Sequence, residues 1–308
     1  MNIGFSSWVT QVPGPPNDRS GPEAYCRVPL SLIRRTRENP GLTGQDFSKL
    51  EGRNRSQSPE IAERPHNSGI LHYGGVFLSL LDLRKENSVY ILTMNNGEKP
   101  NTLTPESMDE FRNILDELEA TRENAALLLT SGHPTVWNTG LDLESISTYG
   151  GQYHDEFAAD LERFFLRLAL LNLPTIGCIT GHAYGGGAML AMTLDFRFMR
   201  EDRGWFRFPA IDMNLTFTPI MHQILELLPN SKALRYLLLA AKEFGGEEAA
   251  ALDIVDHAYP QPVLFEKAME VAHTLAAKDR KTYTTIKLGM RHALVALRAQ
   301  LETEQHLL

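Results

Sequence analysis

The sequence has few cysteines and no long hydrophobic run, and each scarcity excludes a class of protein. Only two of the 308 residues are cysteines, Cys26 and Cys178, which excludes a disulfide-rich secreted scaffold. Cys178 stands in an apolar run and is predicted to be a buried free thiol, which favours a reducing compartment. No apolar run approaches the roughly 18 residues that cross a bilayer, so no membrane span is predicted.

Basic clusters and metal-ligand motifs are also missing. The chain carries 30 Lys and Arg against 38 Asp and Glu, a net charge of −8. Its basic residues form no long cluster, so no nucleic-acid partner is predicted. Neither Cys-x-x-Cys nor His-Glu-x-x-His occurs, so no metal site is predicted. The remaining composition, 43% hydrophobic and 22% charged, is typical of a globular protein with a sizeable core.

Residues 1–70 differ in composition from the rest of the chain. They are rich in Pro, Ser, Arg, Asn and Gly and lack apolar periodicity. This composition predicts a disordered or loosely ordered extension. A targeting segment is the alternative, but Asp18, Glu23 and Glu38 among the arginines weigh against a mitochondrial presequence.

From about residue 70 onward, segments typical of strands and of helices alternate. Thr104 and Pro105 are typical of a helix start, with the threonine as N-cap and the proline at the first helical position. After Thr218 the pattern is mostly helical and is interrupted by the strand-like pair Ile254-Val255. This order predicts an α/β core with a helical C-terminal region. The predicted strands are 76–81, 88–93, 126–130, 175–180 and 195–199, and the other predicted helices are 153–171 and 188–194.

Two glycine-bearing turns, 138–143 and 181–187, are the most informative feature of the chain. Each follows an apolar strand-like run and opens onto a helix-like stretch. A glycine turn at a helix start leaves backbone N–H groups free and lets a ligand approach closely. Two such turns that face each other predict an oxyanion hole, which stabilises negative charge on a carbonyl oxygen.

Five segments, taken in order, resemble the crotonase superfamily of enoyl-CoA hydratases and isomerases, and the resemblance covers about residues 75–275. Residues 199–217 further resemble its plant and fungal Δ3,Δ2-enoyl-CoA isomerase-like branch. The resemblance implies a crotonase-type spiral of ββα repeats over 71–260 and a helical region over 261–308 that forms a homotrimer or hexamer. It also implies an acyl-CoA ligand and no separate cofactor, because CoA is part of the substrate. The five segments are 95–103, 137–143, 181–187, 199–205 and 247–256.

The resemblance assigns the two oxyanion donors to the backbone N–H groups of Leu141 and Gly186. Trp137 and Leu141 are expected to line the CoA or acyl path. Asp142 is also typical of the N-cap of a following helix, and that structural interpretation stays open. The residues that the resemblance places around the CoA and acyl group are Trp137, Thr139, Gly140, Asp142, Tyr184, Gly185 and Ala210.

The catalytic acids of the resembled hydratases are replaced in this chain. Met189 and Ala210 stand where those enzymes have glutamates, and Asn214 stands where the isomerase-like branch has another. Hydration through paired glutamates is therefore not expected. If residues 210–214 are extended, Ala210, Asp212 and Asn214 share one face. Asp212 is then either the general base or a structural acceptor.

Other ionisable residues near the turns have simpler interpretations. Glu144 either points into the pocket or is solvated. A histidine such as His182 can transfer protons near neutral pH, but the resembled branch also carries a histidine at this place with no known role as a base. The sequence thus predicts an acyl-CoA isomerase or hydratase-like enzyme of lipid or secondary metabolism. The alternative is a CoA-binding pseudoenzyme or assembly subunit that lacks the glutamates. The branch favours a peroxisomal location, yet residues 306–308 do not match Ser-Lys-Leu, so a cytoplasmic one stays open.

Overall fold

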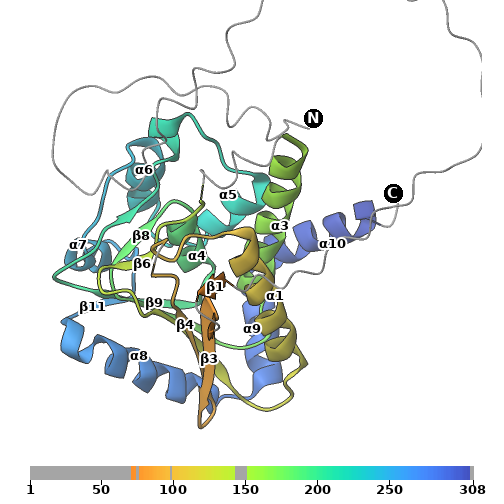
Figure 1. Ribbon diagram of the computed structural model, residues 1–308, viewed down its shortest axis with the longest axis vertical. Helices are drawn as coiled ribbons and strands as arrows, with labels where there is room; N and C mark the ends of the chain where they lie inside the picture. The colour runs from red at the N-terminus through yellow and green to blue at the C-terminus, as the bar shows by residue number, and fades with distance from the viewer. Residues whose placement is uncertain (1–70, 74–75, 98, 143–150, 306–308) are drawn as a thin grey trace, which may run out of the picture. The chain divides into compact units, whose positions relative to one another are not determined.

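The structure, a computed structural model, describes residues 71–73, 76–97, 99–142 and 151–305. The predicted extension over 1–70 and the candidate Glu144 lie outside the described residues. Strands and helices alternate from β3 to β9, and helices dominate thereafter (Figure 1). The chain therefore has the expected α/β core and C-terminal helices.

The largest sheet has six strands in the order β11-β9-β7-β5-β4-β3. All neighbouring pairs are parallel except β3 with β4, which form an antiparallel hairpin. Strands β5 and β7 are buried almost throughout, as expected for parallel strands covered on both faces. The strands are β3 (Leu81–Glu86), β4 (Val89–Met94), β5 (Ala126–Ser131), β7 (Thr175–Ile179), β9 (Phe196–Arg200) and β11 (His257–Tyr259).

A second sheet of three parallel strands carries the two glycine turns. Its order is β10-β8-β6, with β8 in the centre. The strands are β6 (Val136–Asn138), β8 (His182–Tyr184) and β10 (Phe206–Arg207), and a separate hairpin pairs β1 (Leu71–Tyr73) with β2 (Val76–Leu78).

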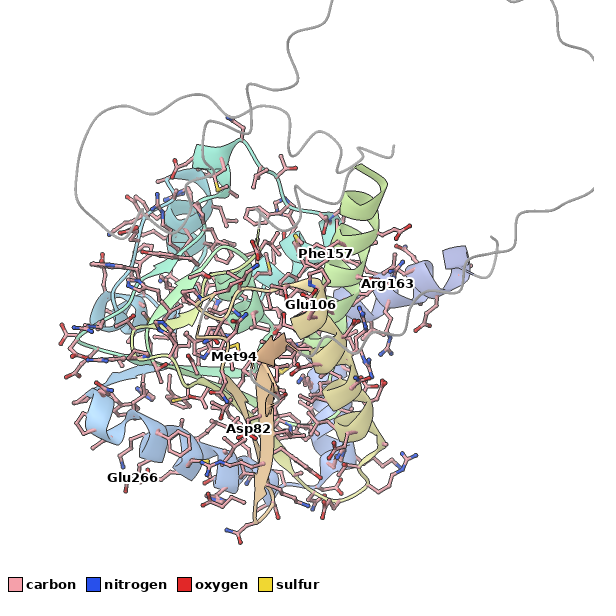
Figure 2. The ribbon with its side chains drawn as sticks, in the orientation of Figure 1. Asp82, Met94, Glu106, Phe157, Arg163 and Glu266 are labelled. Atoms are coloured by element: carbon pink, nitrogen blue, oxygen red, sulfur yellow. The ribbon has the colours of Figure 1, made fainter. Side chains whose placement is uncertain are left out.

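Helices cover both faces of the six-stranded sheet. Val89 and Ile91 of β4 face helix α8 (Gln261–Ala276), whereas Tyr90 and Leu92 face the larger core, because side chains alternate along a strand. Helices α1 (Pro105–Ala120), α3 (Gly151–Ala169) and α4 (Gly186–Thr193) build that core. Figure 1 shows α8 on one side of the strands and α1 with α3 on another. In Figure 2, Glu266 lies on the exposed side of α8, while Met94 lies in the interior.

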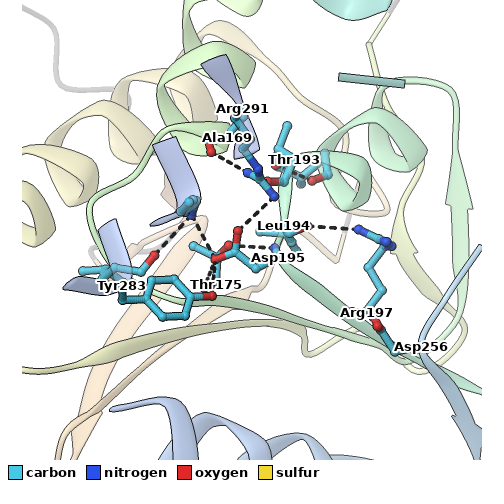
Figure 3. A network of polar contacts seen from close by, with 12 residues as sticks. Ala169, Thr175, Thr193, Leu194, Asp195, Arg197, Asp256, Tyr283 and Arg291 are labelled. Atoms are coloured by element: carbon cyan, nitrogen blue, oxygen red, sulfur yellow. Dashed lines mark hydrogen bonds and ion pairs between the residues drawn. The ribbon is translucent and has the colours of Figure 1, made fainter. Parts of the chain in front are cut away.

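The C-terminal part contains five shorter helices besides α8, and a buried carboxylate fastens one of them to the core. Asp195, just before β9, accepts hydrogen bonds from Tyr283 at 3.1 Å and Lys287 at 3.0 Å and pairs with Arg291 at 2.9 Å (Figure 3). Arg291 also donates to the carbonyl of Thr193, the last residue of α4. The helices are α5 (Pro219–Leu225), α6 (Ser231–Leu239), α7 (Gly246–Ala251), α9 (Arg280–Met290) and α10 (His292–Gln305).

Two local expectations are wrong. The predicted strand 76–81 is split between β2 and β3. Ile254 and Val255 are fully buried in a bend, and the neighbouring strand is β11, which pairs with β9. Apolar β-branched residues suit any buried position, so their presence alone did not locate the strand.

Among the described residues, no helix is long and apolar enough to cross a membrane.

Candidate active site

The two glycine turns touch each other at Gly140 and Gly186. Gly140 has φ +86°, which favours glycine. A Cβ on Gly140 would lie 2.6 Å from the nitrogen of Gly186, and one on Gly186 would lie 3.1 Å from the Cα of Gly140. The contact follows from the sheet, because the parallel strands β6 and β8 run directly into the two turns. Both turns therefore need glycine at the point of contact.

The first turn is fixed by the segment that precedes α1. The N–H of Leu103 donates to the carbonyl of Gly140 at 2.6 Å, and the N–H of Asp142 donates to the carbonyl of Leu103 at 3.3 Å. A parallel bridge joins Leu103 and Leu141. These bonds hold the carbonyl of Gly140 and the N–H of Asp142, which lie on either side of Leu141. The N–H of Leu141 lies between these two fixed groups.

The second turn begins α4. The N–H of Gly185 donates to the carbonyl of Arg207 at 3.0 Å, and Gly186 is the first residue of the helix. The first N–H groups of a helix have no acceptor within it and carry its positive end. Within the described residues, neither the N–H of Gly186 nor that of Leu141 donates a hydrogen bond.

The two free donors lie close together. A Cβ on Gly186 would be 3.5 Å from the nitrogen of Leu141. Two rigid N–H groups at this separation suit a single oxygen atom that gains negative charge. Whether they act as an oxyanion hole stays a prediction from the sequence.

Other residues predicted around the ligand have structural partners. The Thr139 hydroxyl donates to the carbonyl of Pro100 at 3.1 Å, and Asp142 pairs with Lys99 at 2.5 Å. The helix that Asp142 was expected to cap lies outside the described residues. Trp137 is fully buried in the core, so in this structure its side chain does not line an open path.

Tyr184 belongs to a polar cluster on the three-stranded sheet. Its hydroxyl donates to Glu243 at 3.5 Å, and Glu243 also pairs with Arg207 at 2.9 Å. The ring of His182 lies 5.2 Å from that of Tyr184. Burial lowers the pKa of His182 below its usual 6.5; Arg203 lowers it further, and Glu243 opposes the shift.

The positions of the missing glutamates hold no ionisable group. Met189 is buried on α4, and Ala210 begins the 3-10 helix η4 (Ala210–Met213). The expectation of an extended segment over 210–214 is therefore wrong, and Ala210, Asp212 and Asn214 do not share one face of a strand. Pro209 has φ −80° and ψ 9°, which starts the helical turn, and Asn214 ends it with φ +55°.

Asp212 is exposed and pairs with Arg207 at 2.9 Å. Arg207 thereby connects η4 to β10 and to Glu243. Arg207 and Glu243 were not predicted from the sequence, because their partners come from other segments and no local motif marks them. Asn138 stands in the first predicted turn, but the hydrogen bond of its side chain to Gly140 was not predicted. Among the described residues, no group of three or more His, Cys, Asp or Glu side chains is placed to hold a metal ion.

Comparison with known proteins connects this geometry to a family. A family model described as enoyl-CoA hydratase/isomerase matches residues 84–308. Enoyl-CoA delta isomerase 3 of Arabidopsis thaliana is 29% identical over 216 residues, which cover 68% of this chain and 90% of the relative. Enoyl-CoA delta isomerase 2, peroxisomal, of the same plant is 28% identical over 182 residues, covering 57% and 75%.

A solved structure has the same fold. It is an enoyl-CoA hydratase/isomerase family protein from Pseudomonas syringae, with a TM-score of 0.65 and 23% identity. The match covers 74% of this chain and 98% of that protein.

Proposed function

The chain belongs to the enoyl-CoA hydratase/isomerase family, and on this premise we propose that it binds an acyl-CoA and isomerises the acyl chain through a thioester enolate. The observation that carries the proposal is the contact between Gly140 and Gly186, which brings the free N–H groups of Leu141 and Gly186 together. The thioester carbonyl oxygen accepts both hydrogen bonds. A backbone donor cannot rotate away, so the hole needs no reorganisation during the reaction.

The reaction moves a double bond without consuming water. A base removes a proton from C2 of a 3-enoyl thioester, and the electron pair of that C–H bond passes to the carbonyl oxygen to give a dienolate. A proton then adds at C4, the double bond forms between C2 and C3, and the carbonyl is restored. Each N–H donor stabilises the negative oxygen by about 3 kcal/mol.

Isomerisation suits this site better than hydration. Addition of water needs one group to activate the water and another to protonate carbon, whereas an isomerase can move one proton with one base. Met189 and Ala210 supply neither group. Asp212 is the base that we propose to test. That role requires its ion pair with Arg207 to open when the substrate binds.

We further propose that the CoA and acyl groups lie along the two turns. Thr139 and Asp142 flank Gly140 and Leu141 in the first turn, and Tyr184 and Gly185 precede the second donor. We place Ala210 beside the acyl group. Pro209, the residue before Ala210, lies next to the second turn, because its side chain is 3.9 Å from the position of a Cβ on Gly185.

Assembly and location are part of the same proposal. We propose a homotrimer or hexamer formed through the C-terminal helices, where Ile286 and Met290 of α9 are 60% and 78% exposed. Sedimentation analysis of the full chain tests this state. A peroxisomal or cytoplasmic location is proposed from the relatives, one of which is named peroxisomal.

A second candidate is a CoA-binding pseudoenzyme or assembly subunit. It is favoured by the absence of an ionisable side chain at positions 189 and 210. In that case the hole still binds a thioester but no double bond moves.

The test is binding of acetoacetyl-CoA, whose enolate absorbs in the near ultraviolet and forms without help from an enzymatic base. The wild type is expected to raise the enolate fraction. Gly186→Pro removes one N–H donor and also crowds Gly140, so a folded Gly186→Pro variant is expected to lose this effect. Turnover of 3-hexenoyl-CoA then separates the isomerase from the pseudoenzyme. A wild type that neither stabilises the enolate nor isomerises contradicts both.

A further inference from the structure

Asn138 lies beneath both glycine turns. It is the last residue of β6 and is fully buried. The pairing of β6 with β8 shifts between Val136 and Asn138, so an extra residue is accommodated there. Such bulges redirect a side chain next to functional sites.

The side-chain amide of Asn138 is used at both ends. Its Oδ1 accepts a hydrogen bond from the N–H of Gly140 at 2.8 Å, and its Nδ2 donates to the carbonyl of Asn101 at 2.6 Å. A backbone N–H can only donate and a carbonyl can only accept. These partners therefore determine which way the amide points.

Asn138 also supports the second turn. A Cβ on Gly187 would lie 2.1 Å from the carbonyl oxygen of Asn138 and 2.7 Å from its Oδ1. The first turn of α4 therefore rests directly on Asn138, one residue from the donor Gly186. A single residue contacts both halves of the hole.

The bonds around Gly140 orient the donor of Leu141. The amide of Asn138 holds the N–H of Gly140, and Leu103 holds its carbonyl at 2.6 Å. The carbonyl of Gly140 and the N–H of Leu141 belong to one trans peptide and point in opposite directions. Fixing Gly140 at both ends therefore fixes the direction of the Leu141 N–H.

We propose that Asn138 is a positioning residue that sets the relative placement of the two oxyanion donors. The proposal rests on the proposed function, because it assigns Asn138 to the same hole. Loss of the Asn138 amide leaves both N–H groups present but lets the first turn move against α4. A displacement near 1 Å at a reacting centre can lower a rate about 100-fold.

The experiment compares Asn138→Ala and Asn138→Asp with the wild type, using acetoacetyl-CoA and free CoA as probes. The aspartate variant has nearly the same shape and keeps an acceptor for Gly140 but loses the donor to Asn101. Both variants are expected to bind the enolate about 10- to 100-fold more weakly. Free CoA has no thioester oxygen, so its affinity is expected to stay unchanged, which a general loss of structure would not allow.

Asn172→Ala is the matched control, because Asn172 makes structural hydrogen bonds to Glu119 and Arg280 away from the turns. It is expected to bind the enolate as the wild type does. If the folded Asn138 variants stabilise the enolate as the wild type does, the positioning role is overturned. If Asn138→Ala does not fold, the result for Asn138→Asp alone tests the role. A wild type that stabilises no enolate contradicts the proposed function itself.

Discussion

Gly140 and Gly186, from separate turns, are packed so closely that a Cβ on Gly140 would come within 2.6 Å of the nitrogen of Gly186. The positive φ of Gly140 excludes most side chains for a second, independent reason. This contact brings the Leu141 and Gly186 donors together. The closeness of these two donors is therefore a product of strand pairing and glycine, and the proposed oxyanion hole needs no ionisable side chain.

Hydration of crotonyl-CoA is expected to be very slow or absent. Met189 and Ala210 replace the two groups that would activate water and deliver a proton, and each such group contributes a factor of about 10² to 10⁴. The loss of conjugated-thioester absorbance measures the rate. Turnover near or above about 10 per second would require an acid pair elsewhere in the chain.

Ala210→Glu is expected to create or increase isomerisation of 3-hexenoyl-CoA. The new carboxylate stands at the start of η4, next to Pro209, and partial burial raises its pKa toward the range useful to a base. Asp212→Asn, measured in parallel, is expected to abolish turnover only if Asp212 is the wild-type base. An active wild type that Ala210→Glu merely slows would mean that the base is already present elsewhere.

Asp195→Asn is expected to lower the free energy of unfolding by about 3–5 kcal/mol, because it leaves two buried cations, Lys287 and Arg291, without their carboxylate. Denaturant unfolding of the full chain measures the loss. Asp82→Asn, at an exposed position on β3, is the control and is expected to change the value by less than about 0.5 kcal/mol. Equal effects of the two substitutions would show that the network in Figure 3 contributes little to stability.

The stability of the protein is expected to depend on His182 at mildly acidic pH. Burial lowers the pKa of His182 in the folded chain below 6.5, so the unfolded chain binds more protons near and below that pH. The contribution of His182 to stability is therefore present above about pH 6.5 and is lost as the pH falls through its folded pKa. His182→Phe is expected to reduce the slope of unfolding free energy against pH just below about pH 6.5. An unchanged slope would mean that the folded and unfolded pKa values of His182 are equal.

The predictable features were those fixed by local chemistry. Thr104 caps α1 through Ser107, as its neighbour Pro105 indicated. Gly140 has the positive φ of a turn and Gly186 starts α4, but residues 182–184 of the second predicted turn form strand β8. The arrangement of Ala210, Asp212 and Asn214 depended on an extended segment after Pro209. The segment is instead a helical turn, and Asp212 pairs with Arg207.

Long-range polar contacts were beyond prediction. Asp195 meets Tyr283 and Lys287 only after α9 packs on the core, and Asn138 meets Asn101 only after the first turn closes. The sequence around these residues does not show which distant groups they contact. Only the folded chain shows that Asp195 joins α9 to the core and that Asn138 joins the first turn to Asn101.

The most direct test of the oxyanion hole is the infrared band of a bound thioester carbonyl. Butyryl-CoA labelled with ¹³C at the carbonyl is unreactive here, and two N–H donors lower its stretching frequency. The wild type and Gly289→Ala, where a Cβ meets nothing within 4 Å, are expected to shift the band, and Gly140→Ala is expected to return it toward the free value. A band that stays at the free frequency in the bound wild type would contradict the account.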